Sequence, residues 1–141
     1  MTIPLDHTEI LNVLGAPLTV KSTFASSGQF ILDHTVPPGY GVPPHVHADE
    51  DEAYLMLSGE VTFCLDGVEQ IARPGAFVFA PRGHQHSFRN ATGVTARMIV
   101  LCTPGKKLEL FFRQLDAAAR TGGIDETTVI SLAAAHDITV G

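Results

Sequence analysis

The sequence has few cysteines, few basic residues and no long uninterrupted apolar run. Its two cysteines, Cys64 and Cys102, share no CxxC spacing, so we expect buried small side chains rather than a disulfide framework. The sequence contains nine Lys and Arg residues and 15 Asp and Glu residues, and no segment concentrates the basic ones. This charge distribution argues against nucleic acid or anionic membranes as partners. The first residues resemble no signal peptide, and we expect a cytoplasmic protein.

The 141 residues have the composition of one ordinary globular domain, 45% hydrophobic and 17% charged. Short apolar segments recur between glycine and proline turns, and several alternate apolar with polar residues, as 61–65 does. This pattern is typical of an all-β sandwich or barrel. We therefore predict an N-terminal extension over 1–22, a β-barrel over 23–104 and a helical appendage over 105–141.

The appendage shows a different periodicity from the rest of the chain. Apolar residues recur there at helical spacing: Leu108, Phe111, Phe112, Leu115 and Ala119. The pattern predicts a helix that packs on the outside of the barrel and ends at Gly122–Gly123. Asp125 is placed to cap a second helix reaching about Ala135, and 138–140 can add an edge strand.

Three histidines and one glutamate carry the chemistry that the sequence offers. His45 and His47 are two apart, so on a strand they face the same side. Glu52 follows on the next short strand, and His86 comes from a distant one. Three imidazoles and one carboxylate suit one divalent transition metal per chain: Fe, Mn, Ni, Cu, Co or Zn. Four protein ligands would leave positions open for water, substrate or dioxygen.

These residues occur within two segments that resemble the two motifs of the cupin superfamily. The first motif is filled by Gly39, His45, His47, Glu52 and Gly59. The second is filled by Gly75, Pro81, Gly83, His86 and Asn90. The resemblance implies an all-β double-stranded β-helix, the jelly-roll cupin barrel, with the metal held by the three histidines and Glu52. It also implies that Pro81 and Asn90 serve structure rather than chemistry.

Some polar neighbours of the motifs admit more than one interpretation. Asp51 would fit an alternative three-residue spacing after His47, but the usual glutamate and the six residues to Gly59 both favour Glu52. Asp49, Glu50 and Asp51 are interpreted as a solvated loop. His84 is either a surface residue or a second group beside the metal.

Four apolar or aromatic residues are candidate substrate contacts. Tyr54 and Met56 share strand parity with Glu52, and Phe88 shares it with His86, so we expect these and Phe63 to point into the barrel. They either pack the core or line an apolar pocket beside the metal. Tyr54 is the best candidate for a substrate contact, while the side that Arg97 faces is left open.

The run from PPHVH through DE to LSGEV, with the later TPGKKLELFF, looks similar to the bacterial flavonol (quercetin) dioxygenase-like group. The resemblance implies a metal-dependent dioxygenase acting on a small aromatic or enediol-type substrate, with catalytic Glu52 alternating between ligand and general base. A metal-assisted lyase or isomerase and a non-catalytic module that binds a small ligand stand as alternatives. We expect a homodimer, since the residues before Thr23 suit strand exchange.

Overall fold

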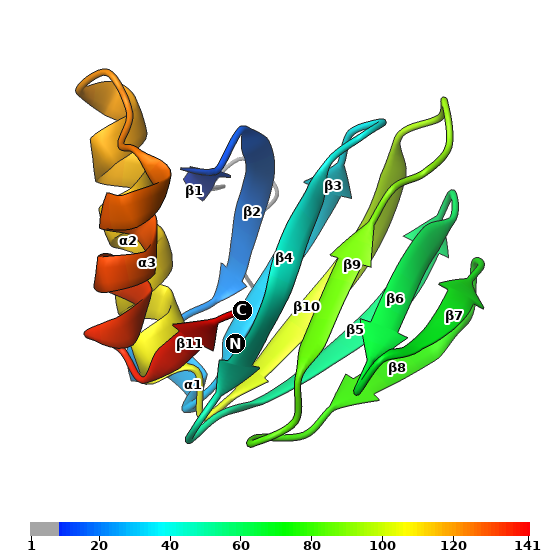
Figure 1. Ribbon diagram of the computed structural model, residues 1–141, viewed down its shortest axis with the longest axis horizontal. Coiled ribbons are helices and arrows are strands. Elements are labelled where there is room, and N and C mark those ends of the chain that lie inside the picture. Colours follow the sequence, from blue (N-terminus) through cyan, green and yellow to red (C-terminus); the bar gives the residue numbers. More distant parts are fainter. Residues whose placement is uncertain (1–8) are drawn as a thin grey trace.

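The protein consists of two antiparallel β-sheets that lie face to face, with a pair of helices along one side (Figure 1). The computed structural model describes residues 9–141. The larger sheet contains, in order, β1 (Glu9–Val13), β2 (Ala16–Ser22), β3 (Phe30–Val36), β10 (Ala96–Thr103), β5 (Asp51–Ser58) and β8 (Phe77–Ala80). The smaller sheet contains β11 (Ile138–Val140), β4 (Gly41–His47), β9 (His86–Arg89), β6 (Val61–Leu65) and β7 (Val68–Ala72). The double-stranded β-helix implied by the motifs is confirmed.

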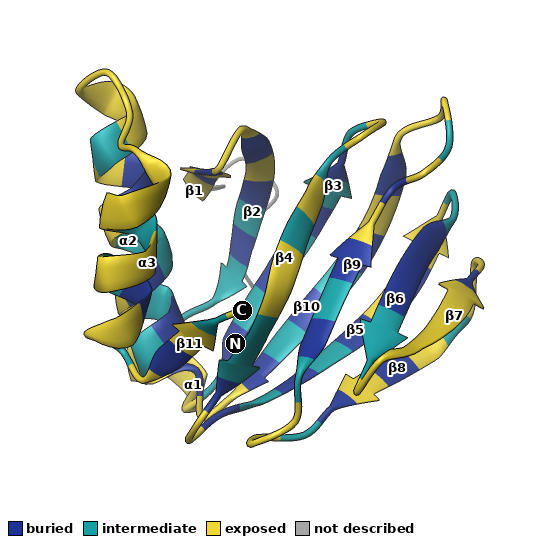
Figure 2. Ribbon diagram, viewed as in Figure 1, coloured by how far each residue is buried: buried dark blue, intermediate teal, exposed yellow. Residues whose placement is uncertain are grey.

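The core lies between the sheets and is built by strands that alternate buried with more exposed side chains (Figure 2). In β3, every second residue from Phe30 to Val36 is buried, and β10 repeats the pattern across the ladder. Period-two alternation of this kind turns one face of a strand toward the core. The inward positions hold both the apolar core and the polar groups described below.

Residues 9–22 form part of the larger sheet. The sequence predicted them as an extension suited to strand exchange, but β1 and β2 make a hairpin, and β2 pairs with β3 of the same chain. The first eight residues of the predicted extension lie outside the described part. Residues 9–22 therefore add two strands to one end of the larger sheet.

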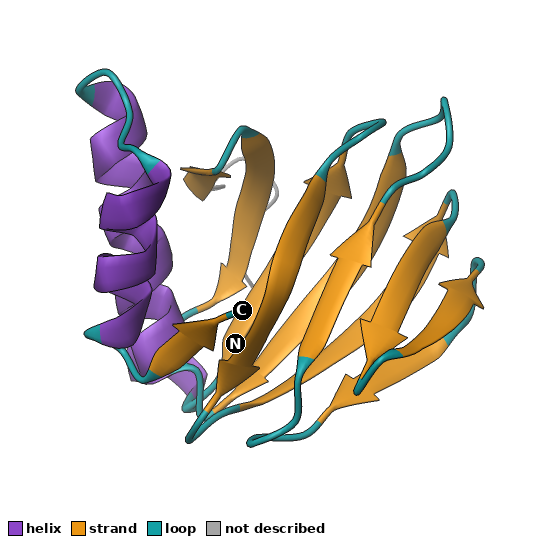
Figure 3. Ribbon diagram, viewed as in Figure 1, coloured by secondary structure: helices purple, strands orange, loops and turns teal. Residues whose placement is uncertain are grey.

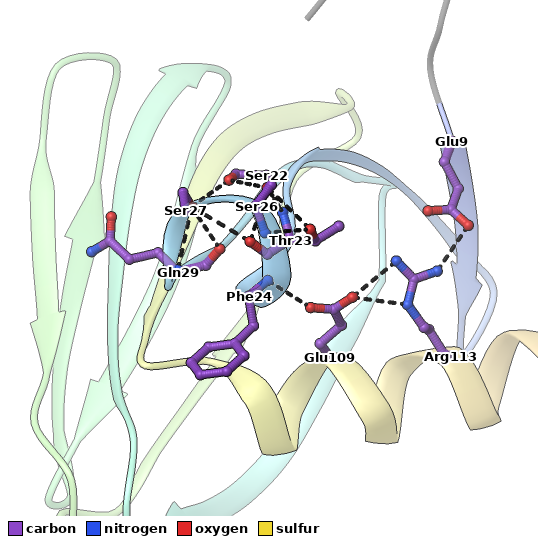
Figure 4. Close-up of polar contacts among 9 residues, drawn as sticks. All are labelled: Glu9, Ser22, Thr23, Phe24, Ser26, Ser27, Gln29, Glu109 and Arg113. Atoms are coloured by element: carbon purple, nitrogen blue, oxygen red, sulfur yellow. Dashed lines mark hydrogen bonds and ion pairs between the residues drawn. The ribbon is translucent and has the colours of Figure 1, made fainter. Parts of the chain in front are cut away.

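A single helical turn, α1 (Phe24–Ser27), precedes β3. Thr23 caps this turn by accepting a hydrogen bond from the backbone N–H of Ser26. Figure 4 shows that the N–H of Phe24 donates to Glu109, whose carboxylate also binds Arg113, which in turn reaches Glu9. These contacts attach the N-terminal hairpin and α1 to the helix that contains Glu109 and Arg113, α2 (Lys106–Arg120).

The C-terminal region forms α2 (Lys106–Arg120), α3 (Glu126–Ala134) and then β11, and Figure 3 shows the two helices side by side. Asp125 caps α3 as predicted, accepting from Thr128 N at 2.7 Å, and β11 is the predicted edge strand. As the helical pattern predicted, α2 packs along the side of the two sheets (Figure 1). Its apolar face lines a cavity together with residues of both sheets. None of the helices within 9–141 is long and apolar enough to cross a membrane.

Two motif residues, Gly59 and Asn90, serve the geometry of the fold rather than the chemistry of the site. Gly59 has φ +73°, and a Cβ there would lie 2.7 Å from Ala96 Cα, so no larger side chain fits without movement. The buried amide of Asn90 donates to the carbonyl oxygens of Val36 and Val94. Asn90 therefore ties the ends of β3 and β9 together, as the resemblance implied.

Candidate metal centre

Four side chains from three strands and both sheets meet at one buried point. His45 and His47 come from β4, His86 from β9 of the same sheet, and Glu52 from β5 of the opposite sheet. Each offers one donor atom, and these atoms all lie within 4.8 Å of one another. Strand register explains the meeting, since His45 lies opposite His86 in the β4–β9 ladder. The structure thus brings together all four residues that the sequence predicted as ligands.

The carboxylate of Glu52 presents its two oxygens to different neighbours. Oε2 lies 3.0 Å from His86 Nε2 and 3.1 Å from His47 Nε2, whereas Oε1 lies 3.9 Å from the thiol of Cys102. His47 Nε2 is near Oε2 but is not aligned for a hydrogen bond. Within residues 9–141 it is a buried nitrogen without a partner. A buried polar atom of this kind needs a partner, and a metal ion at the centre would provide one.

For His45 and His86, the contact that Nδ1 makes with a backbone carbonyl leaves Nε2 as the free nitrogen of the ring. His45 Nδ1 lies 2.9 Å from the carbonyl oxygen of Pro43, to which it donates, so Nε2 keeps its lone pair. Such a bond fixes ring orientation and tautomer in metal sites. His86 Nδ1 makes a longer contact of 3.4 Å with the carbonyl of His84.

The electrostatics keep Glu52 ionised and His45 neutral, the forms in which these two side chains bind a cation. Burial, with a smaller contribution from the neighbouring His86 ring, lowers the pKa of His45 from 6.5 to about 4. Burial alone would raise the pKa of Glu52, but its contacts with His47 and His86 hold it well below the usual value. Burial lowers the pKa of His47, yet the contact and charge of Glu52 outweigh this and raise it. A carboxylate beside a neutral imidazole is the ionisation state that a divalent metal requires.

The donor set fits one divalent transition metal, with three nitrogens and one oxygen. The four ligands would be His45, His47, His86 and Glu52. Bound there, the metal would supply a Lewis acid and, if redox-active, an electron-exchange centre. The donors do not select one metal among Fe, Mn, Ni, Cu, Co and Zn.

A cavity of about 370 Å³ is lined by three of the four donors, His45, His47 and Glu52, and extends to the C-terminal helices. Tyr54 and Phe88 line it. Met56 and Phe63 are fully buried but lie outside its lining, where they pack the core. Strand parity placed all four residues inside the barrel as predicted, but only position along the strand decides which of them meets the cavity.

The three acidic neighbours of Glu52 are not all part of a solvated loop, which corrects the interpretation from sequence. Glu50 is buried and accepts hydrogen bonds from the N–H groups of Lys107 and Leu108, in the first turn of α2. Those N–H groups have no partner within the helix, and the helix dipole favours an anion there. Asp51 pairs instead with Arg82, and Asp49 with Lys107.

Other polar residues lie away from the donors. His84 is exposed and bonds Asp66 at 2.7 Å, which agrees with the surface interpretation. Arg97 faces outward and pairs with Asp33. Neither side chain lines the cavity.

Sequence reasoning missed two polar features of the site. His34 was given no role, yet it is buried and lines the cavity. Its signal was present, because it shares strand parity with Phe30, Leu32 and Val36. The thiol of Cys102 was interpreted only as a small buried side chain, and its contact with Glu52 depends on β5–β10 pairing, which the sequence does not reveal.

Replacing His47 with Ala should weaken metal binding at least about a hundredfold, since the loss of a ligand exceeds the tenfold to hundredfold cost of removing its supporting partner. Titration calorimetry with Zn²⁺ or Ni²⁺ and elemental analysis measure this. His84→Ala is the matched control, because His84 lies outside the cluster. Wild-type metal content in His47→Ala would contradict the assignment of these ligands.

Acid should destabilise the protein through His34, whose pKa burial lowers from 6.5 to about 4. Between these values the unfolded chain binds a proton that the folded protein excludes, so the free energy of unfolding falls as pH drops. A shift of this size corresponds to about 3 kcal/mol between pH 7 and pH 4. Urea unfolding at both pH values should show that His34→Phe loses less stability than wild type by about that amount. Equal losses would show that His34 is not held neutral.

Comparison with known proteins agrees with this geometry. Residues 32–102, half of the chain, match the cupin domain family. Quercetin 2,3-dioxygenase of Bacillus subtilis (strain 168) is 34% identical over 91 residues, which cover 64% of this chain and 26% of that protein. The chain therefore spans about a quarter of the length of that relative.

Solved structures share the fold at lower identity. A predicted oxalate decarboxylase from Thermotoga maritima has a TM-score of 0.64 at 21% identity, covering 73% of this chain and 98% of that one. A sugar phosphate isomerase of the cupin superfamily from Silicibacter pomeroyi has a TM-score of 0.63 at 21% identity, covering 73% and 75%. These likenesses establish the architecture, and the matched segment from β3 to β10 contains both motifs and all four donors. The chain belongs to the cupin family.

Proposed function

We propose that the protein is a metal-dependent dioxygenase that acts on a small aromatic or enediol-type substrate. The observation that carries the proposal is the contact between an apolar cavity and the four-donor cluster. Ligand sites of this kind combine apolar walls with a few convergent polar groups. The partial identity to the Bacillus quercetin 2,3-dioxygenase supports the same reaction class.

The walls of the cavity favour a substrate that is mostly apolar. Aromatic side chains line it from both sheets and from α2, among them Tyr54, Phe88 and Phe111. No Lys or Arg within 9–141 belongs to the lining. A sugar phosphate would enter this space without a cation to pair with its charge, at a high desolvation cost. The isomerase alternative is therefore less well supported than the dioxygenase.

Glu52 would accept the proton of a substrate hydroxyl group. Its contacts with the histidines keep it ionised at neutral pH, and its position among the donors brings it within reach of a group that approaches them. The thiol of Cys102 lies 3.9 Å from Oε1, away from the histidines that contact Oε2, and would hold the carboxylate in place while the proton moves. The apolar walls would exclude bulk water from the reacting group.

Oxygen uptake tests the proposal. Protein loaded separately with Fe²⁺, Mn²⁺, Ni²⁺, Cu²⁺, Co²⁺ and Zn²⁺ should consume oxygen with at least one flavonol or catechol. Glu52→Gln should keep metal through the three histidines and lose turnover about a hundredfold or more, the usual value of a general base. Glu60→Gln is the control, since Glu60 pairs with Arg73 away from the cavity.

Each other outcome of this assay supports a different alternative. Turnover without oxygen consumption would support a metal-assisted lyase or isomerase, and saturable binding without turnover would support a ligand-binding module. Either result would overturn the dioxygenase proposal.

We also propose that the protein forms a homodimer, and that it works in the cytoplasm, where its two free cysteines stay reduced. Phe77 and Phe79 are exposed on the edge strand β8, and Phe77 lies opposite the exposed Leu55 of β5. An edge strand with apolar neighbours can pair with a second copy. Sedimentation velocity should show a dimer that dissociates in a Phe77→Ser/Phe79→Ser double variant. A monomeric wild type at high concentration would contradict dimerisation.

A further inference from the structure

The cavity contains a second polar position, His34, at a distance from the metal donors. His34 lies opposite Met98 in the β3–β10 ladder, whereas Glu52 lies opposite Cys102, four residues further along β10. At about 3.4 Å per residue, the two positions are separated by roughly 14 Å along the strand. Both side chains line the same cavity, so a ligand in contact with both extends along the strand direction.

The hydrogen bonding of His34 fixes what its ring offers to the cavity. Nδ1 lies 2.8 Å from the carbonyl oxygen of Thr35, to which it donates. This bond assigns the ring proton to Nδ1 and leaves Nε2 with a lone pair. Nε2 has no hydrogen-bond partner within residues 9–141. Among the described residues, the fully buried side-chain nitrogen or oxygen without a partner is His47 Nε2. His34 Nε2 also has no partner among them, so it is not fully buried. It faces the cavity that His34 lines.

Within residues 9–141, the two rings that contact His34 supply no donor for Nε2. The hydroxyl of Tyr40, whose ring contacts His34 edge-on, donates to the carbonyl oxygen of Val13 at 2.8 Å. The other ring in contact belongs to Phe88, which is apolar. Burial lowers the pKa of His34 to about 4, so its ring is neutral and Nε2 accepts hydrogen bonds at physiological pH. This end of the cavity therefore presents acceptors to a ligand.

We propose that His34 is the specificity-determining residue of the cavity, and that Nε2 accepts a hydrogen bond from a hydroxyl or amino group at the end of the substrate remote from the metal. The inference rests on the proposed function, because it assumes that the other end of the substrate reaches the metal donors. The substrate class is thus an elongated, largely apolar molecule with a ligating oxygen at one end and a hydrogen-bond donor at the other.

The physical basis is the cost of an unpaired acceptor. A ligand that fills the cavity removes water from Nε2, and a ligand without a donor leaves that lone pair unsatisfied. A ligand with a correctly placed hydroxyl replaces the lost water bond. Discrimination between two such ligands should be about tenfold, in line with the energy of one neutral hydrogen bond.

The experiment uses the full-length protein loaded with Zn²⁺, which is redox-inert, so that binding is measured without turnover. The probes are three biphenyl-3,4-diols that differ only at the 4′ position, which carries hydroxyl, hydrogen or methoxy. Calorimetry should show that the 4′-hydroxyl compound binds about tenfold more tightly than the other two. The hydrogen compound controls for the bulk of the methyl group.

Two variants assign the preference to His34. His34→Phe keeps a ring against Tyr40 and Phe88 but removes the acceptor, and should bind all three compounds equally. His34→Gln offers an amide oxygen near the place of Nε2 and should restore part of the preference. A purely packing role would change the stability of the variants but not the ratio of affinities.

The inference fails if wild type binds the three compounds equally, if the preference survives in His34→Phe, or if none of the compounds binds. Oxygen uptake with flavonols and catechols decides the proposed function separately. An active dioxygenase without the 4′ preference would overturn the role of His34 alone, and a preference without oxygen uptake would overturn the dioxygenase alone.

Discussion

The fold depends on holding one carboxylate, Glu52, inside the protein among three imidazoles. A buried charge is costly unless it is paired and hydrogen-bonded, and removing one partner of such a group costs more than the pair contributes. Oε2 is therefore turned to His47 and His86, and Oε1 to Cys102. Because Glu52 belongs to one sheet and the histidines to the other, this pairing also fixes how the two sheets face each other.

The C-terminal segment is joined to the same place by two sets of contacts. β11 pairs with β4 so that Ile138 lies opposite His47 and Val140 opposite His45. Glu50, two residues before Glu52, accepts from the first turn of α2. The helices that close the cavity are thus attached to the strands that carry the donors, and the shape of the cavity and the geometry of the donors depend on one another.

The sequence predicts the donors well because each of them occurs within a short motif. A two-residue step on a strand puts His45 and His47 on one side whatever surrounds them, and the two motifs add Glu52 and His86. Parity likewise predicts which residues point inward. Strand parity does not predict which inward residues line a cavity. From the sequence alone, Phe63, which packs the core, and His34, which lines the cavity, therefore look alike. The contribution of α2 to the cavity and the burial of Glu50 depend on contacts between distant segments, which no local pattern encodes.

The pairing of β11 with β4 has a consequence for the order of folding. The donor strand β4 gains its outer neighbour only when a segment far along the chain returns to it, and His86 arrives on β9, whose neighbours in the chain belong to the other sheet. Contacts of long sequence separation form late, because the entropy of closing the intervening loop opposes them until other contacts exist. No short fragment of the chain can assemble the donor set. The nascent polypeptide consequently offers a metal ion little more than the His45–His47 pair, and selective uptake becomes a property of the finished tertiary structure.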